Sequence, residues 1–190
     1  MAFRTGRARR LAKIRVAGAC KLASPAAKHT ERRRMSAIDP VTRLIAIEEI
    51  KQLKARYFRC MDTKDYAGLR QVFADDAVFD ASCSLSIEPA ADAENWTHSG
   101  GDQIAAFVES AVDALHTVHH GHCHEIELLS ETEARGVIAM EDQIWDANGA
   151  LFLHGMGHYH ETYRKEEGGW KIVTSRISRL HVIVGSSGVE

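Results

Sequence analysis

The dipeptide Asn148-Gly149 lies between two long segments in which apolar and polar residues alternate, Thr132–Asp146 and Leu151–Arg164. Alternation with a period of two is typical of β-strands, because successive side chains point to opposite faces of a sheet. Asn-Gly is the strongest two-residue signal for a hairpin turn. The sequence therefore predicts a long antiparallel hairpin in the second half of the chain.

This hairpin also predicts which residues face one another. With Asn148 and Gly149 as the only turn residues, Ala147 faces Ala150, and Trp145 faces Phe152. Further along, Asp142 lies opposite Gly155, and Met140 lies opposite Gly157. One strand face then carries six residues of which five are small or apolar: Ala134, Gly136, Ile138, Met140, Asp142 and Ile144.

Asp142 is the only acid on that predicted core-facing side. Glycines in strand interiors leave space, so Gly155 and Gly157 predict room beside the carboxylate. A buried carboxylate is costly unless it is paired or its pKa rises, which makes Asp142 a candidate for acid–base chemistry. A slip of one residue in register would instead expose it to solvent.

Helical signals come before the strands. Asp39-Pro40 is typical of a helix N-terminus, with an N-cap acceptor followed by proline in the first turn. Apolar residues then recur every three to four positions, as on one helix face: Leu44, Ile47, Ile50, Leu53, Tyr57 and Met61. Asp65 predicts a second, short helix through Phe73, and Gly100-Gly101-Asp102 opens a third that ends in a histidine-rich stretch at 116–124.

Between these helices we expect a strand around Ala77–Cys83 and a loop over Ser84–Ser99. From Glu125 onward the pattern predicts strands only, with a last one over Trp170–Val184. Helices gathered first and strands gathered last predict an α+β fold, in which a curved, mostly antiparallel sheet wraps around N-terminal helices.

Residues 1–35 differ from the rest of the chain, since they hold 11 Lys and Arg residues and a single acid, whereas the remaining residues are acidic overall. We interpret 1–35 as a basic arm, either disordered, an Arg-rich targeting peptide, or upstream sequence before a true start at Met35, and 36–190 as one domain. Because that domain is acidic, we expect no nucleic-acid partner. No apolar run approaches the roughly 20 residues that span a bilayer, so we expect no membrane contact.

The cysteines and the clustered histidines are candidate metal ligands. The four cysteines lack metal-type spacing and are interpreted as reduced thiols of a cytoplasmic protein. Five histidines crowd into residues 116–124, but their spacing matches no familiar zinc motif. A single histidine oriented by a carboxylate, which makes a general base near neutral pH, is the simpler hypothesis, with no metal.

Two residues of the first helix are further candidates. Asp62 ends this helix, where the macrodipole disfavours an acid, although it could simply cap the turn that follows. Tyr57 lies five residues earlier on a largely apolar face, and it could equally be a core tyrosine with its hydroxyl at the rim.

The segments Ile47–Asp62, Val118–Asp142 and His158–Ile172 together resemble the SnoaL-like, nuclear transport factor 2-like family, and within it the bile-acid 7α-dehydratases, scytalone dehydratases and hexachlorocyclohexane dehydrochlorinases. The resemblance covers roughly residues 39–184 and is poor over Ser84–Ser99. It implies a cone-shaped fold. It also implies catalytic roles for Tyr57, Asp62, His119 and Asp142, and we expect substrate contacts from His122, Met140, Gly155 and Gly157.

The resemblance further implies a cofactor-independent dehydratase that removes water from a hydroxylated, carbonyl-bearing steroid or polycyclic molecule. An isomerase or a polyketide cyclase would begin with the same proton abstraction, and a non-catalytic ligand-binding module is a third possibility. The resembled dehydratases are trimers, so we expect a homo-oligomer, a trimer before a dimer. An apolar outer sheet face is predicted for this contact from Val137, Ala139, Trp145, Phe152 and Met156, with the facing pair Trp145–Phe152 as the anchor for a partner subunit. The alternative is that His181–Val184 covers that face in a monomer.

Overall fold

A computed structural model describes residues 38–185, so the predicted basic arm lies outside the described residues. The helices are α2 (Pro40–Asp62), α3 (Tyr66–Arg70) and α4 (Gly101–Val112), with a short 3-10 turn at Ala93–Trp96. The strands are β1 (Phe73–Asp80), β2 (Thr97–Ser99), β3 (His116–Leu128), β4 (Glu133–Trp145), β5 (Leu151–Glu166) and β6 (Gly169–Val184). None of the described helices has the length and apolar character needed to cross a membrane.

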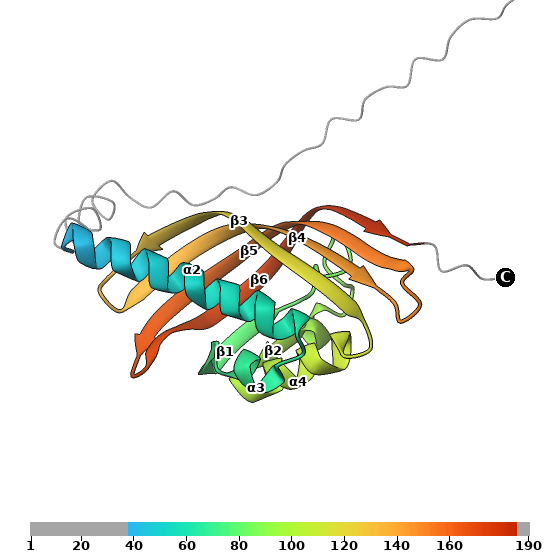
Figure 1. Cartoon of the computed structure of the whole chain (residues 1–190), viewed down its shortest axis with the longest axis horizontal. Helices are drawn as coiled ribbons and strands as arrows, with labels where there is room; N and C mark the ends of the chain where they lie inside the picture. Colours follow the sequence, from blue (N-terminus) through green and yellow to red (C-terminus); the bar gives the residue numbers. More distant parts are fainter. Residues whose placement is uncertain (1–37, 186–190) are drawn as a thin grey trace, which may run out of the picture.

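The strands form one six-stranded sheet in the order β2-β1-β6-β5-β4-β3, in which only β1 and β6 run parallel. The sheet curves, and the helices lie on its concave side, with α2 running across the strands (Figure 1). The predicted α+β fold with helices inside a curved, mostly antiparallel sheet is confirmed. The outer face of the sheet is left without a covering helix in the described part of the chain (Figure 1).

Helix α2 begins where the sequence predicts. The Asp39 carboxylate accepts a hydrogen bond from the Thr42 amide at 2.9 Å, which satisfies a free N–H of the first turn. From Ile50 onward the predicted apolar face is buried, but Leu44 is 66 % exposed. The N-terminal end of α2 extends past the strands, which leaves its first turns exposed (Figure 1).

Two sequence-based boundaries were wrong. The second helix stops at Arg70, because Val72 and Phe73 join the sheet: the Val72 carbonyl accepts from the Ile172 amide at 3.0 Å, and Phe73 pairs with Ile172. The histidine-rich stretch is not a helix end but most of β3, with a bulge at Cys123, whose φ is +44°. Alternating polar side chains on a sheet edge concealed this strand from the apolar pattern.

The register of the β4–β5 hairpin is confirmed where it concerns the candidate site. Asp142 pairs with Gly155 and Met140 pairs with Gly157, and all six predicted core-facing residues of β4 are buried. The turn itself differs from the two-residue prediction. Residues 146–150 form the loop, in which one Asp146 carboxylate oxygen accepts from the amides of Asn148 and Ala150. As a result, Trp145 pairs with Leu151 rather than with Phe152, which becomes the extra residue of a bulge.

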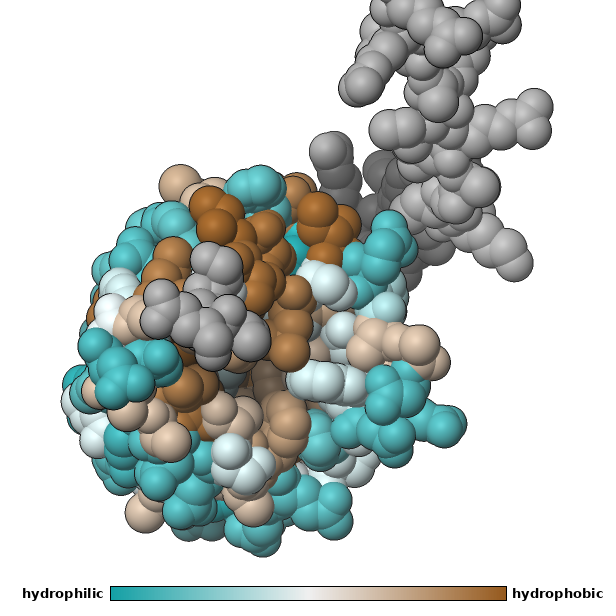
Figure 2. All heavy atoms as spheres, turned by 90° about the vertical axis from the view of Figure 1, so that its right-hand side faces the viewer, coloured by the Kyte–Doolittle hydropathy of each residue, from teal (hydrophilic) through white to brown (hydrophobic). Residues whose placement is uncertain are grey.

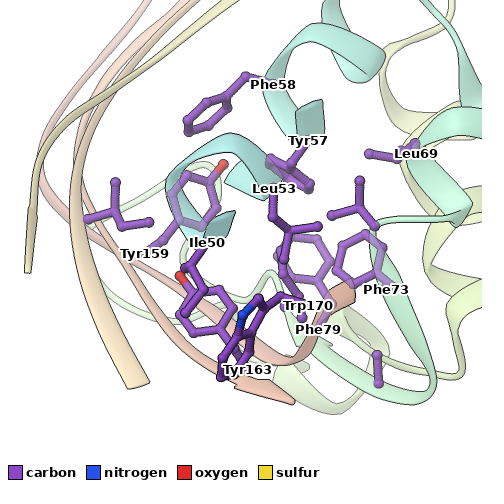
Figure 3. Close-up of a cluster of buried hydrophobic side chains, with 14 of the residues drawn as sticks. Ile50, Leu53, Tyr57, Phe58, Leu69, Phe73, Phe79, Tyr159, Tyr163 and Trp170 are labelled. Carbon is purple, nitrogen blue, oxygen red and sulfur yellow. The ribbon is translucent and has the colours of Figure 1, made fainter. Parts of the chain in front are cut away.

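The core contains a cluster of aromatic rings that includes Tyr57, Tyr159 and Tyr163 (Figure 3). Within it lies a fully buried ion pair, in which Lys54 Nζ is 2.6 Å from Glu161 Oε1. The Lys54 ammonium also lies 3.4 Å from the centre of the Tyr159 ring, and the Glu161 carboxylate accepts from the hydroxyls of Tyr163 and Ser175. Burial lowers the pKa of Lys54, and the negative charge of Glu161 opposes that shift.

We expect Glu161→Leu to lower the free energy of unfolding by about 3–5 kcal/mol, because it leaves the Lys54 charge buried without a partner. The double variant Lys54→Met/Glu161→Leu should lose less than the sum of the two single variants, since no lone charge remains. Urea unfolding measures both. Glu127→Gln breaks an exposed ion pair with Arg135 and should cost less than about 1 kcal/mol. Equal losses for Glu161→Leu and Glu127→Gln would contradict the prediction.

Candidate active site

The concave side of the sheet, α2 and α4 enclose a cavity of about 360 Å³, which is a usual size for a small-molecule pocket. Six aromatic side chains line it: Tyr57, Phe79, Trp96, Phe107, Phe152 and Tyr159. Besides the two tyrosines, its titratable or charged side chains are those of His119, Asp142 and Arg179. A second depression, of about 700 Å³, lies on the outer face of the sheet, and no predicted site residue lines it.

His119 and Asp62 form a hydrogen-bonded pair at the junction of α2 and β3. His119 Nδ1 lies 2.6 Å from Asp62 Oδ1, and the backbone amide of His119 donates to Asp62 Oδ2 at 2.9 Å. Because Nδ1 faces the carboxylate, it carries the proton, and Nε2 is left as the basic nitrogen. The His119 side chain is 5 % exposed and its ring stacks on that of Phe58. The predicted carboxylate-oriented histidine is therefore present in the geometry.

Asp62 remains ionised although it is half-buried. Burial raises the pKa of its carboxyl, but the hydrogen bonds from His119 and Thr117 and the proximity of the imidazole outweigh burial and hold this pKa below the ordinary value of 3.8. Asp62 does not line the apolar cavity itself. It borders an open groove between α2 and β3, behind His119. Its position therefore suits an orienting group better than one that touches a substrate.

Asp142 is buried on the core face, as predicted, but its partner is an arginine. Arg179 Nη1 and Nη2 donate to the two oxygens of Asp142 at 2.9 and 2.8 Å, a bidentate pair with both side chains nearly inaccessible. Arg179 also donates to the carbonyl of Ser84 through Nε and Nη2, at 3.1 and 2.8 Å. Asp142 pairs in the β3–β4 ladder with His119, so the two side chains are neighbours in the cavity.

The sequence reasoning missed Arg179. The buried residues of β6 change from even to odd positions between Ile172 and Ser175, where Val173 is an extra residue on β6 that shifts its register with β5. After that shift Ile177 and Arg179 face the core together. The available signal was that Arg179 lies two residues after the apolar Ile177 and so shares its strand face. That face can be identified as the core face only once the bulge is known.

Two buried tyrosines complete the polar part of the cavity. Tyr57, from α2, was predicted, whereas Tyr159, from β5, was missed although it is in phase with Gly155 and Gly157. Burial raises the pKa of the Tyr57 phenol, against a hydrogen bond from Tyr159 that lowers it. Burial likewise raises the pKa of Tyr159. Both phenols therefore keep their protons and can act as hydrogen-bond donors.

The structure gives other roles to the four predicted substrate contacts. His122 is exposed, lies on the outer face opposite Ala139, and lines the α2–β3 groove rather than the cavity. Met140 Sδ lies under Arg179, 3.2 Å from Nη1. A Cβ at Gly155 would collide with Arg179 and Asp142, and one at Gly157 with the Ser178 carbonyl. The glycines thus make room for the ion pair and for close strand packing, not for a substrate.

The histidines of β3 point to different sides of the sheet, since His120 and His122 pair with the outward-facing Glu141 and Ala139. Across residues 38–185, no group of three or more His, Cys, Asp or Glu side chains is arranged to hold a metal ion.

Comparison with known proteins places this geometry in a family. The family model of the SnoaL-like domain matches residues 42–176. A protein of Novosphingobium aromaticivorans assigned as a scytalone dehydratase has a TM-score of 0.67 at 19% identity, covering 77% of this chain and 91% of its own. A hexachlorocyclohexane dehydrochlorinase from Novosphingobium barchaimii has a TM-score of 0.63 at 17% identity, covering 80% and 97%. Another N. aromaticivorans protein, assigned as an aromatic ring hydroxylase, has a TM-score of 0.63 at 21% identity, covering 78% and 96%.

At these identities the solved structures show the shared fold, and the family model matches most of the chain. The chain therefore belongs to the SnoaL-like domain family, with its nuclear transport factor 2-like fold.

Proposed function

We propose that this protein is a cofactor-independent hydro-lyase, which removes water from a hydroxylated, carbonyl-bearing steroid or other polycyclic molecule. The observation that carries the proposal is the Asp62–His119 pair, whose free imidazole nitrogen belongs to an apolar cavity. Two structural neighbours bear the names of elimination enzymes, a dehydratase and a dehydrochlorinase. Both reactions remove a proton and a leaving group from neighbouring carbon atoms.

The proposed reaction needs only side chains of the chain itself. Asp62 holds the imidazole with Nδ1 protonated, and His119 Nε2 removes a proton from the carbon next to the substrate carbonyl. The Tyr57 phenol, which accepts a hydrogen bond from Tyr159, keeps its proton and donates a hydrogen bond to the carbonyl oxygen as negative charge develops on it. The carbon–oxygen bond to the hydroxyl then breaks, and the imidazolium returns its proton to the departing oxygen, which leaves as water.

The charges of the cavity favour a neutral substrate. Arg179 is neutralised by its bidentate pair with Asp142, so the described lining of the cavity offers no unpaired cationic side chain to bind a carboxylate or phosphate. The aromatic wall offers flat apolar surfaces to a ring system. The substrate class is therefore an uncharged polycyclic ketone with a nearby hydroxyl.

An isomerase or polyketide cyclase shares the first proton transfer but releases no water. A ligand-binding module needs neither the oriented imidazole nor the buried phenols. Incubation with a panel of neutral 3-oxo-hydroxysteroids, followed by mass spectrometry, separates the three: loss of one water supports the hydro-lyase, a product of unchanged mass supports an isomerase, and binding without conversion supports a module. We further propose a cytoplasmic location, which fits the free thiols of Cys60, Cys83 and Cys123.

We also propose that the outer face of the sheet binds further copies of the chain, most simply in a trimer. Val118 is 40 % exposed there, opposite Gln143 and one outward-facing position from Trp145, and Ala139 and Val137 continue the same face further along β4. The segment His181–Val184 does not cover this face, because it pairs with β5 as the end of β6. The predicted anchor Trp145–Phe152 is absent, since Phe152 lines the cavity instead.

His119→Ala and Asp62→Asn should each lower turnover at least about a hundredfold, because the first removes the base and the second its orientation. Circular dichroism should stay unchanged in both variants. Glu141→Gln is the matched control, since this carboxylate also pairs with a histidine, His154, but on the outer face. Near-normal turnover in either cavity variant, with the fold intact, would refute the assignment.

Asp142→Asn should change the charge preference of the cavity, because the Arg179 guanidinium loses its counter-charge. We expect tighter binding of a steroid carboxylate and little gain for its neutral methyl ester, both measured by isothermal titration calorimetry. Turnover of the neutral substrate should fall as well, because the unpaired Arg179 charge would disfavour the imidazolium that forms on the neighbouring His119. A carboxylate that binds no better to Asp142→Asn than to the unmodified protein would count against the neutral-substrate assignment.

Light scattering at micromolar concentration should give the mass of a trimer. Val118→Lys should weaken the assembly by placing charge on the outer face, whereas Val41→Lys, on the exposed start of α2, should not. A monomeric mass for the unmodified protein would refute the assembly, and a dimeric mass would refute the trimer alone.

A further inference from the structure

Lys64 adopts a backbone conformation that normally belongs to glycine. Its φ is +60°, in the left-handed region, and it follows the last turn of α2. The Asp65 amide donates to the Cys60 carbonyl and the Lys64 amide to that of Met61, which is the Schellman pattern of a helix end. Glycine occupies this position most easily, because a Cβ strains the backbone there. A lysine at this point therefore needs a reason beyond ending the helix.

The Lys64 side chain supplies such a reason. Its ammonium donates to the Val112 carbonyl at the end of α4, at 2.7 Å, and to Thr117 Oγ1 at 3.4 Å. Burial lowers the pKa of this ammonium, and the negative charges of Asp62 and Asp113 oppose that shift. The ammonium is thus held beside the Asp62 carboxylate without forming a direct ion pair with it.

Thr117 links this cation to the candidate base. Its side chain is buried in β3, and its hydroxyl donates to Asp62 Oδ1 at 2.9 Å. Because the Lys64 ammonium can only donate, it occupies a lone pair of the Thr117 oxygen and directs the hydroxyl proton toward Asp62. Asp62 then accepts from Thr117, from the His119 amide and from His119 Nδ1, so its orientation is fixed from three sides.

We propose that Lys64 and Thr117 are positioning residues for the Asp62–His119 pair, and that they act in the order Lys64, Thr117, Asp62, His119. The inference rests on the proposed function only in giving this pair a catalytic task. The residues themselves touch no substrate, since neither lines the cavity. Their part is to keep Asp62 ionised and to hold the imidazole with Nε2 free.

The test begins with the carboxyl of Asp62, whose titration is followed by carbon-13 NMR without any substrate. Thr117→Val removes the hydroxyl at nearly constant shape, and Lys64→Met removes the positive charge. Each should raise the pKa of Asp62 by roughly half a unit or more, because a hydrogen bond or a cation that favours the carboxylate is lost. Thr117→Ser should restore the normal titration, and Lys165→Met, at a distant surface pair with Glu49, should leave it unchanged.

Protein stability provides a second measurement, in which Thr117→Val and Lys64→Gly should differ. Asp62 has a lowered pKa, so its contribution to stability is present above the unfolded value of 3.8 and is lost as the pH falls through the folded pKa. In Thr117→Val that loss should begin at higher pH. Lys64→Gly, by contrast, relieves the positive φ and should melt at the same or a higher temperature near neutral pH, although it too raises the pKa of Asp62.

The outcomes are separable from those for the proposed reaction. A raised pKa of Asp62 in Thr117→Val, Lys64→Met and Lys64→Gly supports the inference whether or not the protein eliminates water. If it does eliminate water, kcat should fall in these variants by a larger factor than KM changes. An unchanged titration in these three variants overturns the inference. A lower melting temperature of Lys64→Gly together with an unchanged pKa of Asp62 also overturns it, because Lys64 would then only connect the end of α2 to the end of α4.

Discussion

The Asp62 carboxylate joins the end of α2 to the edge strand β3, and the geometry of the candidate site follows from this junction. An edge strand exposes backbone N–H groups that have no neighbouring strand, and Asp62 accepts from one of them at His119. The same carboxylate accepts from the ring of that residue. One acid therefore fixes where the helix ends on the sheet, closes part of the edge and orients the imidazole, so its three tasks cannot be separated by substitution at Asp62 alone.

A second charged group, the Asp142–Arg179 pair, joins β4 to β6 across β5 on the same concave face. Two ionised side chains can lie there only because Gly155 carries no Cβ, which would otherwise overlap both of them. The pair also reaches the Ser84 carbonyl and so secures the segment that follows β1. The glycine, the ion pair and the loop anchor form one unit, in which each part requires the other two.

Much of this arrangement could be predicted from the sequence. Period-two alternation placed Asp142 opposite Gly155 on the core face, and the helix cap at Asp39 set the start of α2. Bulges account for most of the misses: the one at Phe152 on β5 moved that residue into the cavity, and the one at Val173 on β6 changed the phase of that strand so that Arg179 faces the core. Alternation is a local signal, whereas a bulge depends on the partner strand. The partner of Asp142 was likewise out of reach, because it lies on a strand two positions away in the sheet.

The rim of the cavity is formed by different kinds of structural element from the end that holds the Asp62–His119 pair. Leu85 and Phe152 line the cavity and are 44 % and 37 % exposed, and apolar residues gather on the end of the molecule that holds the β4–β5 hairpin and the end of β6 (Figure 2). These two residues belong to a loop and a bulge, elements that tolerate insertion and exchange. Asp62 and His119 stand instead on a helix and a paired strand. The rim can therefore change by substitution or insertion without displacing Asp62 and His119, so the shape of the cavity mouth is independent of the geometry of this pair.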